Sequence, residues 1–568
     1  MNPQPPVTRM RMAARTSSAE GDAPAEYSPA AAGLRDHLEA WKARLAETDW
    51  IPWLILGLAA FLRFFLLGIK PPHFDEGING WFVDQVMHSG FYRYDPTNYH
   101  GPLHFYVLLL SESLLGRNLW ALRLPVVLVS IGCVWLMLKF EPLVGRNVSR
   151  IAALAMVVSP GFVFYGRYAI HEVWLQFFST MFILGLLGLW KSGRVNYLWY
   201  AGMGTAGMIL TKETYAIHLA CGVLAIPGLM VSSLLNRVPD AKPAKQTWSY
   251  IDLAMVLGVG AAAIVVFYSG TFLNWNGVKG LYQAFKAWTA TGAAGHGHEK
   301  PWDYWLKLMG PSWEFGQADF LGYELPMLVG LILCLFLGLG LFLCLFSQKF
   351  RKMNLFNNLS LRYLAIYGVG TLILYSYVKY KTPWCIISFG WPFLFIFGAA
   401  VLLVRPKHLQ IAYRAIGVLL CISLGSCIWL NYFRCSSPDE PYAYVQTYND
   451  IFKLTKPLLT LAKRNPAYYH LTGHLIRSST YPLPWVLGDF DRVGYYEGGN
   501  MPANVDGDFL LVQQDKIKQV ESKLKGTYYT DTVTIRNYQD PSKLYFKAEI
   551  FKEFFPGKAP DFVGKGPG

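Results

Sequence analysis

The chain has 568 residues, of which 53% are hydrophobic, 16% are aromatic and only 15% are charged. Soluble proteins carry about 25% charged residues, so this composition excludes an ordinary soluble protein and predicts a polytopic α-helical membrane protein. The net charge of +14 comes without any nucleic-acid-binding motif. We therefore expect no nucleic-acid partner, and we interpret the excess of Lys and Arg as a mark of cytoplasmic loops.

Residues 1–50 form a tail that differs from the rest of the chain. They are rich in Ala, Pro and Ser, carry several Arg and Lys residues, and lack the apolar core of a signal peptide. This composition predicts a cytoplasmic tail whose first part is disordered. Within it, residues 33–46 have the apolar spacing of an amphipathic helix that lies on the membrane surface.

Residues 51–430 contain a series of apolar runs, many of them close to the ~20 residues that cross a bilayer. The eleven predicted spans are 51–69, 120–140, 150–166, 172–190, 197–211, 214–235, 251–272, 325–347, 360–378, 384–404 and 411–430. Residues 102–117 form a further apolar helix. These runs predict a transmembrane domain that covers most of the chain.

The connections between the spans are of two kinds. Basic connections, which the positive-inside rule places in the cytoplasm, alternate with connections that carry isolated polar groups. The latter, predicted to face outside, are 70–101, 167–172, 211–214, 273–324 and 380–384. Only an odd number of crossings fits between Gly101 and Glu141, so either 102–117 is an interfacial or re-entrant helix, or it crosses and a later segment does not. We expect eleven crossings and an extracytoplasmic C-terminus; thirteen crossings with the same ends are the alternative.

Residues 431–568 are polar and contain no span, which predicts a soluble extracytoplasmic domain. The stretches YYHLTG (468–473), DFLLVQQ (508–514) and YYTDTVTIR (528–536) are typical of strands. The stretch DKIKQVESKLKG (515–526) is typical of a helix that ends at a glycine. Alternating strands and helices indicate a small α/β domain.

Charged and histidine side chains gather in the predicted outer loops, whereas the inner loops carry dispersed Lys and Arg. A charge inside a membrane helix costs about 2.5–3.5 kcal/mol on insertion scales, so such a gathering indicates a polar site on one face. Asp75 and Glu76 follow the first span directly. Adjacent carboxylates disfavour each other's ionisation, which suits a general base or a metal ligand. Alternatively, both acids cap the helix that begins at Gly77, with Arg63 as their counter-ion.

Other polar groups of the outer loops also have two interpretations. Lys212 and Glu213 suit a binding site, or a simple ion pair between two short spans. His171 and Glu172 suit the same site, or the cap of the next span. The stretch GHGHEKPW is a metal site, a loop that covers the substrate, or a plain surface loop. Permanent cations in these loops suit a phosphate or pyrophosphate. The substrate-binding candidates are Arg63, His100, His104, Arg167, His171, Lys212, Lys379 and Lys381, and the metal-binding candidates are Asp75, Glu172, His296, His298 and Glu299.

Six motifs together resemble the GT-C superfamily of polyprenyl-phosphate-dependent membrane glycosyltransferases. They are HFDEGINGW (73–81), YRYDPTNYHGPLHFY (92–106), YGRYAIHE (165–172), TKET (211–214), GHGHEKPW (295–302) and YKTPW (380–384). Protein O-mannosyltransferases and the aminoarabinose transferase that acts on lipid A are relatives in this superfamily. The set is most similar to the flippase activity-associated protein family of N-glycosylation gene clusters. The resemblance covers residues 51–430 and reaches the C-terminal domain through YPLPWVLGDFDRVGYY (481–496).

This resemblance implies a site and a reaction. Asp75, with Glu76 beside it, corresponds to the acidic general base or metal-site residue of the first outer loop, and Glu172 corresponds to a second acid. His100 stands where the lipid A enzyme has a phosphate-binding Lys-Pro-Pro stretch, so the phosphate role passes to Lys212, Lys379 or Lys381.

The implied enzyme lies in the cell membrane. It transfers a sugar from a polyprenyl-phosphate donor to a glycan, lipid or protein acceptor on the extracytoplasmic face, with Mg2+ or Mn2+ as a possible cofactor. The alternatives are a translocase-associated or transport protein for lipid-linked saccharides, and a non-catalytic scaffold.

Overall fold

A computed structural model describes residues 48–236, 243–295, 297–310, 324–344, 346–347, 357–497, 500–537, 539 and 541–564. The amphipathic helix predicted at 33–46 lies outside these residues. The chain divides into two compact units, Met1–Ile51 and Pro52–Gly568. The fold described below is that of the second unit.

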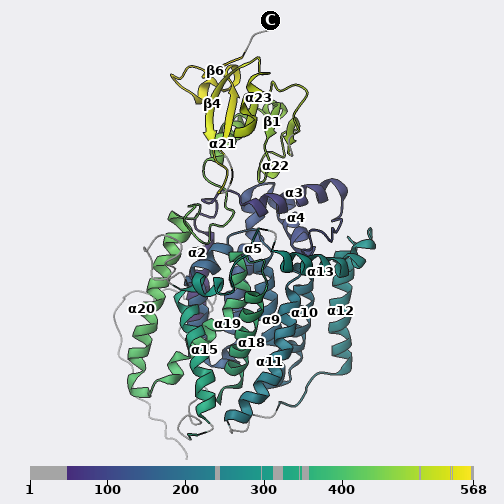
Figure 1. Ribbon diagram of the computed structural model, residues 1–568. Coiled ribbons are helices and arrows are strands. Elements are labelled where there is room, and N and C mark those ends of the chain that lie inside the picture. The colour runs from purple at the N-terminus through teal and green to yellow at the C-terminus, as the bar shows by residue number, and fades with distance from the viewer. Residues whose placement is uncertain are drawn as a thin grey trace, which may run out of the picture. The chain divides into compact units, whose positions relative to one another are not determined.

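Long helices run side by side through this unit (Figure 1). They are α2 (Ile51–Phe64), α5 (Leu119–Lys139), α7 (Arg146–Val158), α8 (Pro160–Tyr165), α9 (Glu172–Ser192), α10 (Val195–Thr211), α11 (Tyr215–Asn236), α12 (Tyr250–Tyr268), α15 (Leu325–Leu343), α18 (Leu359–Tyr377), α19 (Ile386–Gly398) and α20 (Leu409–Ile428). Each predicted span coincides with one of these helices, except that 150–166 is divided between α7 and α8. The described residues contain eight helical segments long and apolar enough to cross a membrane, and α2, α7 with α8, and α10 are not among them. The prediction of a polytopic helical membrane protein is confirmed.

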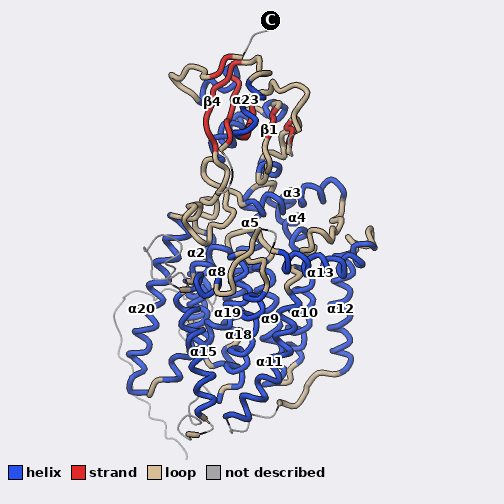
Figure 2. Tube along the Cα trace, viewed as in Figure 1, coloured by secondary structure: helices blue, strands red, loops and turns tan. Residues whose placement is uncertain are grey.

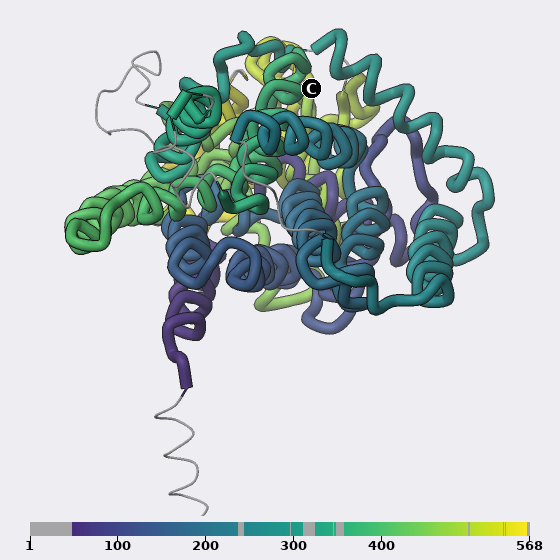
Figure 3. Tube along the Cα trace, turned by 90° about the horizontal axis from the view of Figure 1, so that it is seen from below, coloured from purple at the N-terminus to yellow at the C-terminus, as the bar shows by residue number. Residues whose placement is uncertain are grey.

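The helices differ in how deeply they are buried. Every residue of α19 is buried, because this helix packs against α7, α15 and α18. An α-helix that is apolar on all sides is expected at such a central position. By contrast, α12 and α20 lie at opposite edges of the bundle (Figure 3). Large apolar side chains of α12 are exposed, among them Leu257, and a lipid bilayer would cover them.

Three further helices lie near one end of the bundle: α3 (Phe74–Ser89), α4 (Leu103–Leu115) and α13 (Asn276–Ala294). The α4 helix has 13 residues and packs against α3 and α5. At about 1.5 Å per residue, it is too short to cross a hydrocarbon layer of about 30 Å, which favours the interfacial alternative for 102–117. Figure 1 shows α13 running across the direction of α12.

Among the described residues, the strands lie in the C-terminal part of the chain (Figure 2). They form one sheet in the order β2-β1-β3-β5-β4-β6, in which β1 pairs with β2 and β3 in parallel and the other pairs are antiparallel. Their bounds are β1 (Gly473–Ile476), β2 (Val493–Tyr496), β3 (Phe509–Gln513), β4 (Thr527–Val533), β5 (Ser542–Lys547) and β6 (Phe562–Val563). The α21 helix (Ile451–Arg464) buries Leu454 and Leu458 in a core that it shares with β3 and β5. The small mixed domain predicted here is present.

The predicted elements of this domain are partly right. The strands expected at 508–514 and 528–536 correspond to β3 and β4, and the helix expected at 515–526 is reduced to α23 (Ile517–Glu521). The strand predicted at 468–473 is wrong, because Pro466–His470 forms a helical turn that the Asn465 side chain caps. Proline favours the first position of a helix, and this local signal outweighs the strand preference of the two tyrosines that follow.

The C-terminal domain packs tightly on α3 through α22 (Leu483–Val486). A side chain at Gly77 would collide with Pro482, and one at Gly80 would collide with Trp485. Arg117 strengthens this junction, since it donates two hydrogen bonds to Asp84 and one to the Trp485 carbonyl. The close approach of Pro482 to Gly77 and of the Trp485 ring to Gly80 explains the two glycines in HFDEGINGW.

Candidate active site

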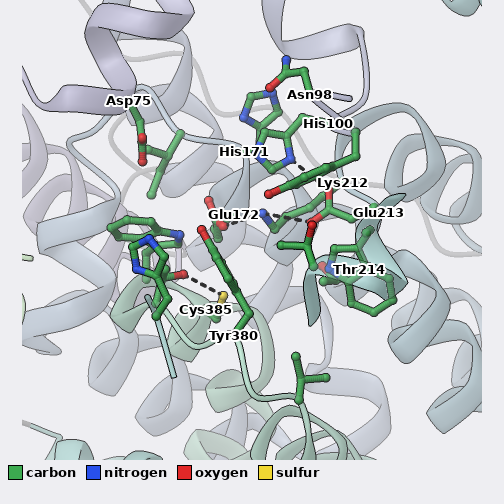
Figure 4. Close-up of a pocket in the computed structure, with 18 of the residues that line it drawn as sticks. Asp75, Asn98, His100, His171, Glu172, Lys212, Glu213, Thr214, Tyr380 and Cys385 are labelled. Atoms are coloured by element: carbon green, nitrogen blue, oxygen red, sulfur yellow. Dashed lines mark hydrogen bonds and ion pairs between the residues drawn. The ribbon is translucent and has the colours of Figure 1, made fainter. Parts of the chain in front are cut away.

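A cavity of about 250 Å3 opens where α3, α13 and the predicted outer loops meet. Its wall includes Phe74, Asp75, Asn98, His100, His171, Glu172, Lys212, Glu213, Thr214, Trp288, His298, Tyr375, Tyr380, Trp384, Cys385 and Val445. All six motifs of the resemblance contribute to this wall, and GHGHEKPW does so through His298. Figure 4 shows these side chains converging on one space.

One side of the cavity carries a buried ion network of His100, Glu172, Lys212 and Glu213, here called the cavity network. Lys212 Nζ lies 2.8 Å from Glu172 Oε1 and 3.5 Å from Glu213 Oε1. His100 Nδ1 lies 2.9 Å from Glu213 Oε2. Burial alone would raise the pKa of Glu213, but the charges of Lys212 and His100 outweigh it and lower this pKa to about 2. Burial opposes the charge of Lys212, yet Glu172 and Glu213 hold its pKa well above the usual value.

Three histidine rings, one of them that of His100, lie in contact at this network. The His171 ring lies 4.5 Å from that of His100 and 4.2 Å from that of His104, measured between centroids. His104 accepts a hydrogen bond from Trp174 Nε1 and donates one to the Ala169 carbonyl, which leaves its ring neutral. Burial, together with the two neighbouring rings, holds the pKa of His171 well below its usual value. His171 Nε2 is buried without a hydrogen-bond partner, so it is available to a ligand in the cavity.

Asp75 stands apart from the cavity network on the other side of the space (Figure 4). Its side chain is 34% exposed, and its nearest ionisable contact is His73 Nδ1 at 3.8 Å. That ring is neutral, because Nδ1 accepts the Asp75 N–H and Nε2 donates to the Tyr444 carbonyl. Burial lowers the pKa of His73 as well. Among the described residues, no cation lies within ion-pair distance of Asp75, so its carboxylate is open to a substrate.

Glu76 occupies a different environment, although it is the next residue. Arg123 donates to both of its oxygens, at 2.8 and 2.7 Å, and the backbone N–H groups of His73 and Ala169 donate at 2.9 and 3.0 Å. Burial would raise the pKa of Glu76, but Arg123 and these hydrogen bonds lower it to about 2. The capping alternative therefore applies to Glu76, which forms a capping box with His73. Its counter-ion is Arg123 and not Arg63.

Two predicted binding residues lie elsewhere in the protein interior. Arg63 donates to Ser130 Oγ at 2.7 Å and contacts two backbone carbonyls, and Arg167 donates to the Leu62 and Leu66 carbonyls. Both are fully buried and neither lines the cavity. The structure brings His100, His171 and Lys212 together at the cavity wall, and it leaves these two arginines beneath it.

The loop after α13 closes over another part of the cavity. His298 lines the wall and its Nδ1 lies 2.6 Å from the Tyr444 hydroxyl. Lys381 is buried and donates to the Lys300 and Val378 carbonyls at 3.1 and 2.5 Å. These two hydrogen bonds hold the loop after α13 in place. Burial lowers the pKa of this ammonium group. Lys379 and Glu299 are exposed, and neither is part of the wall.

The predicted metal ligands do not assemble. The part of the chain that the structure describes contains no group of three or more His, Cys, Asp or Glu residues arranged to hold a metal ion. Glu172 is held by Lys212, and Asp75 lies on the opposite side of the cavity. His296, one of the predicted ligands, lies outside the described residues. Among the described residues, Asp75 and Glu172 therefore do not share one metal site with His298 and Glu299.

Two kinds of residue were missed by the sequence reasoning. Arg123 is a charge inside the apolar run 119–139, and that alone would have marked it as paired or functional. Tyr444 and Val445 reach the cavity from the start of the C-terminal domain, and no local pattern distinguishes them. Long-range contacts of this kind require the folded structure.

Comparisons with known proteins follow the motifs. A family model described as "Dolichyl-phosphate-mannose-protein mannosyltransferase" matches residues 99–266. Among solved structures, the chain is similar to ArnT from Cupriavidus metallidurans bound to undecaprenyl phosphate, with a TM-score of 0.56, 13% identity, and coverage of 88% of this chain and 98% of that one. The chain has the fold of the GT-C membrane glycosyltransferases. The apo structure of the same ArnT gives a TM-score of 0.53, 15% identity, and coverage of 92% and 99%.

The family model and the GT-C fold together confirm the prediction of a membrane glycosyltransferase of this superfamily. A search of curated proteins finds no match. At 13–15% identity the structural likeness concerns the fold alone. The donor, the acceptor and the roles of single residues therefore depend on the cavity of this chain.

Proposed function

We propose that this protein transfers a sugar from a polyprenyl-phosphate-linked donor to a hydroxyl group of an acceptor, on the extracytoplasmic face of the cell membrane. The observation that carries the proposal is Asp75: a carboxylate that no cation of the described residues approaches within ion-pair distance, open to a cavity whose opposite wall holds a buried lysine. A general base must reach the proton that it removes and must be unoccupied beforehand. Asp75 meets both conditions, and Glu76 meets neither.

The surroundings of the cavity suit a lipid-linked donor. A second, more open groove is lined by Tyr215, Leu281 and Phe285, and it shares α13 and the start of α11 with the cavity. Trp288 and Thr291 belong to the cavity, and Phe285 lies one turn earlier on the same helix. A polyprenyl chain in the apolar groove would bring its phosphate and sugar to the polar cavity. The structurally similar ArnT was solved bound to undecaprenyl phosphate. This complex supports a polyprenyl-phosphate-linked donor.

In the proposed reaction, the acceptor oxygen attacks the anomeric carbon of the donor sugar. The bond from that carbon to the phosphate oxygen breaks, the polyprenyl phosphate leaves with the electron pair, and Asp75 takes the acceptor proton. Lys212 and His171 lie on the opposite wall, where Lys212, and His171 in the tautomer with its proton on Nε2, would stabilise the developing phosphate charge. Each step is written with groups of the chain itself.

The test compares wild type and Asp75→Asn protein, purified full-length, with a panel of polyprenyl-phosphate sugars. Asparagine keeps the shape but accepts no proton, so turnover should fall by about 10²–10⁴. Undiminished transfer by a folded Asp75→Asn protein would refute the assignment. Donor binding without turnover by wild type would instead favour the alternative of a transport or accessory protein.

The proposed orientation is a cytoplasmic N-terminus and an extracytoplasmic C-terminal domain. It rests on the alternation of basic and polar loops along the sequence. Single cysteines placed at exposed positions such as Asp515, labelled in intact cells with a membrane-impermeant reagent, test it. Labelling of the C-terminal domain from outside is the expected result.

A further inference from the structure

Arg536 is a buried cation whose partners are incomplete. It follows β4 in the C-terminal domain and is 6% exposed. Its Nη2 donates to Ser479 Oγ at 2.7 Å, and its guanidinium carbon lies 4.1 Å from the centre of the Phe74 ring. Its Nη1 is buried and has no hydrogen-bond partner. None of the carboxylates that the structure describes lies within ion-pair distance of this side chain.

The neighbouring Arg477 shows that this domain can satisfy a buried arginine. Arg477 is 3% exposed, and its three nitrogens donate to the Ser479 carbonyl, Ser542 Oγ and Gln539 Oε1 at 2.7, 3.2 and 2.6 Å. A buried charge without such partners is costly. The free nitrogen of Arg536 is therefore an exception within its own surroundings, and exceptions of this kind point to a ligand that completes the set.

Arg536 also lies directly behind the cavity wall. Phe74, which its guanidinium contacts, lines the cavity together with Asp75. Burial lowers the pKa of Arg536 to about 10, and the charge of Asp75 works against this decrease. Arg536 is accordingly a cation at neutral pH, and it is close enough to Asp75 for their charges to interact.

The charges at the cavity wall indicate a role for the Arg536 cation. The wall carries three carboxylates, Asp75, Glu172 and Glu213, and among the described wall residues Lys212 is the lysine that faces them. Two of these carboxylates already pair with Lys212. An anionic substrate that enters therefore meets an excess of negative charge, unless a further cation lies next to the wall.

We propose that Arg536 binds an oxyanion of a substrate, a phosphate or carboxylate group, next to Phe74 on the Asp75 side of the cavity wall. This inference rests on the proposed function and deepens it, because it assigns a part of substrate recognition to the C-terminal domain. A guanidinium group suits an oxyanion better than an ammonium group, since it offers two parallel N–H donors. The oxyanion is an anionic group of the acceptor if the donor phosphate lies at Lys212 on the opposite wall, and it is the donor phosphate if that group lies at Arg536 instead.

The experiment measures binding and needs no turnover. The thermal unfolding temperature of the full-length protein in detergent is followed against inorganic phosphate, with sodium chloride at matched ionic strength as the reference. Phosphate should stabilise the wild type, and Arg536→Gln should weaken phosphate binding about tenfold or more, as expected for a lost charge-assisted hydrogen bond. Arg536→Lys, which keeps the charge, should retain part of the effect.

Two variants control for indirect effects. Phe74→Leu removes the aromatic contact but leaves the guanidinium charge, so it should keep most of the phosphate effect. Arg464→Gln removes an exposed arginine that pairs with Glu553, so it should bind phosphate as wild type does. Equal stabilisation of wild type and Arg536→Gln by phosphate would overturn the proposal, as would stabilisation by sodium chloride alone.

A second arm identifies the source of the oxyanion. Binding of undecaprenyl phosphate to the protein in lipid nanodiscs is compared between wild type and Arg536→Gln. A loss of both probes assigns Arg536 to the donor phosphate, and a loss of inorganic phosphate alone assigns it to an anionic acceptor. Asp75→Asn separates the two proposals: it should abolish transfer but keep the phosphate effect, so a failure of one proposal leaves the other standing.

Discussion

The cavity and the region beneath it both contain buried charges, but they differ in how completely those charges are satisfied. Beneath the cavity lies what we call the sealed cluster: Lys70, Glu76 and Arg123, all with no exposed surface. Arg123 binds Glu76 with two hydrogen bonds and three backbone carbonyls with its remaining donors. The cavity, by contrast, leaves the Asp75 carboxylate and His171 Nε2 without partners.

This difference separates a structural role from a chemical one. A buried polar group that has all its hydrogen bonds stabilises one conformation and has nothing left for a substrate. A polar group that lacks a hydrogen-bond partner at a cavity wall destabilises the protein until a ligand supplies that partner. Asp75 and Glu76 are adjacent in sequence and of the same chemical type, and only the partners around them distinguish the two roles.

The largest expected effect comes from breaking the sealed cluster. Glu76→Gln leaves Arg123 buried without its counter-ion, and such a change costs about 3–5 kcal/mol of folding free energy. We expect a strong decrease in the yield of folded protein and in its thermal unfolding temperature. The isosteric Asp75→Asn is the matched control, and it should keep the unfolding temperature of wild type while turnover is lost. A stable Glu76→Gln protein would contradict the assignment of Glu76 to the structure.

The next effect concerns pH. The pKa of Glu213 in the folded protein is about 2, below the value of about 4.3 in an unfolded chain. Stability from this group is therefore complete above the unfolded pKa and is lost as pH falls toward 2. The unfolding temperature of Glu213→Gln should start lower at neutral pH and fall less steeply below about pH 4.3. Asp515→Asn, at an exposed position, is the control. If the unfolding temperatures of wild type and Glu213→Gln fell equally steeply below about pH 4.3, this result would contradict the geometry of the cavity network.

A smaller effect tests the open nitrogen of His171. Phenylalanine keeps the ring and its stacking on His104 but removes both nitrogens, so His171→Phe should fold with wild-type stability. If Nε2 contacts the donor phosphate, the KM for the donor should rise about tenfold or more, as expected for a lost hydrogen bond to a charged group. Donor KM unchanged, with normal turnover, would assign this nitrogen no part in binding.

The apolar runs of the sequence predict the helices well, because a helix that crosses a membrane requires a continuous apolar run. The same reasoning locates Asp75, which lies in a polar motif directly after a span. It cannot locate the Arg536 contact with Phe74, since residues far apart in the chain meet only through the packing of α22 on α3. It also cannot separate Asp75 from Glu76, because their difference lies in the distant partners Arg123 and Ala169.

The smallest expected effects come from Lys379 and Lys381, two predicted phosphate ligands that are two residues apart. Lys381→Met removes two hydrogen bonds to backbone carbonyls, which hold the loop containing His298 in place, so we expect a loss of about 1–3 kcal/mol of stability and lower turnover. Lys379 is exposed and lies outside the cavity wall, so Lys379→Met should change neither the unfolding temperature nor turnover. Thermal unfolding and initial-rate measurements on both variants test the pair. A loss of stability and turnover in Lys379→Met, with none in Lys381→Met, would contradict this prediction. It would mean that Lys379 holds the loop over the cavity, and that burial does not indicate the role of these two cations.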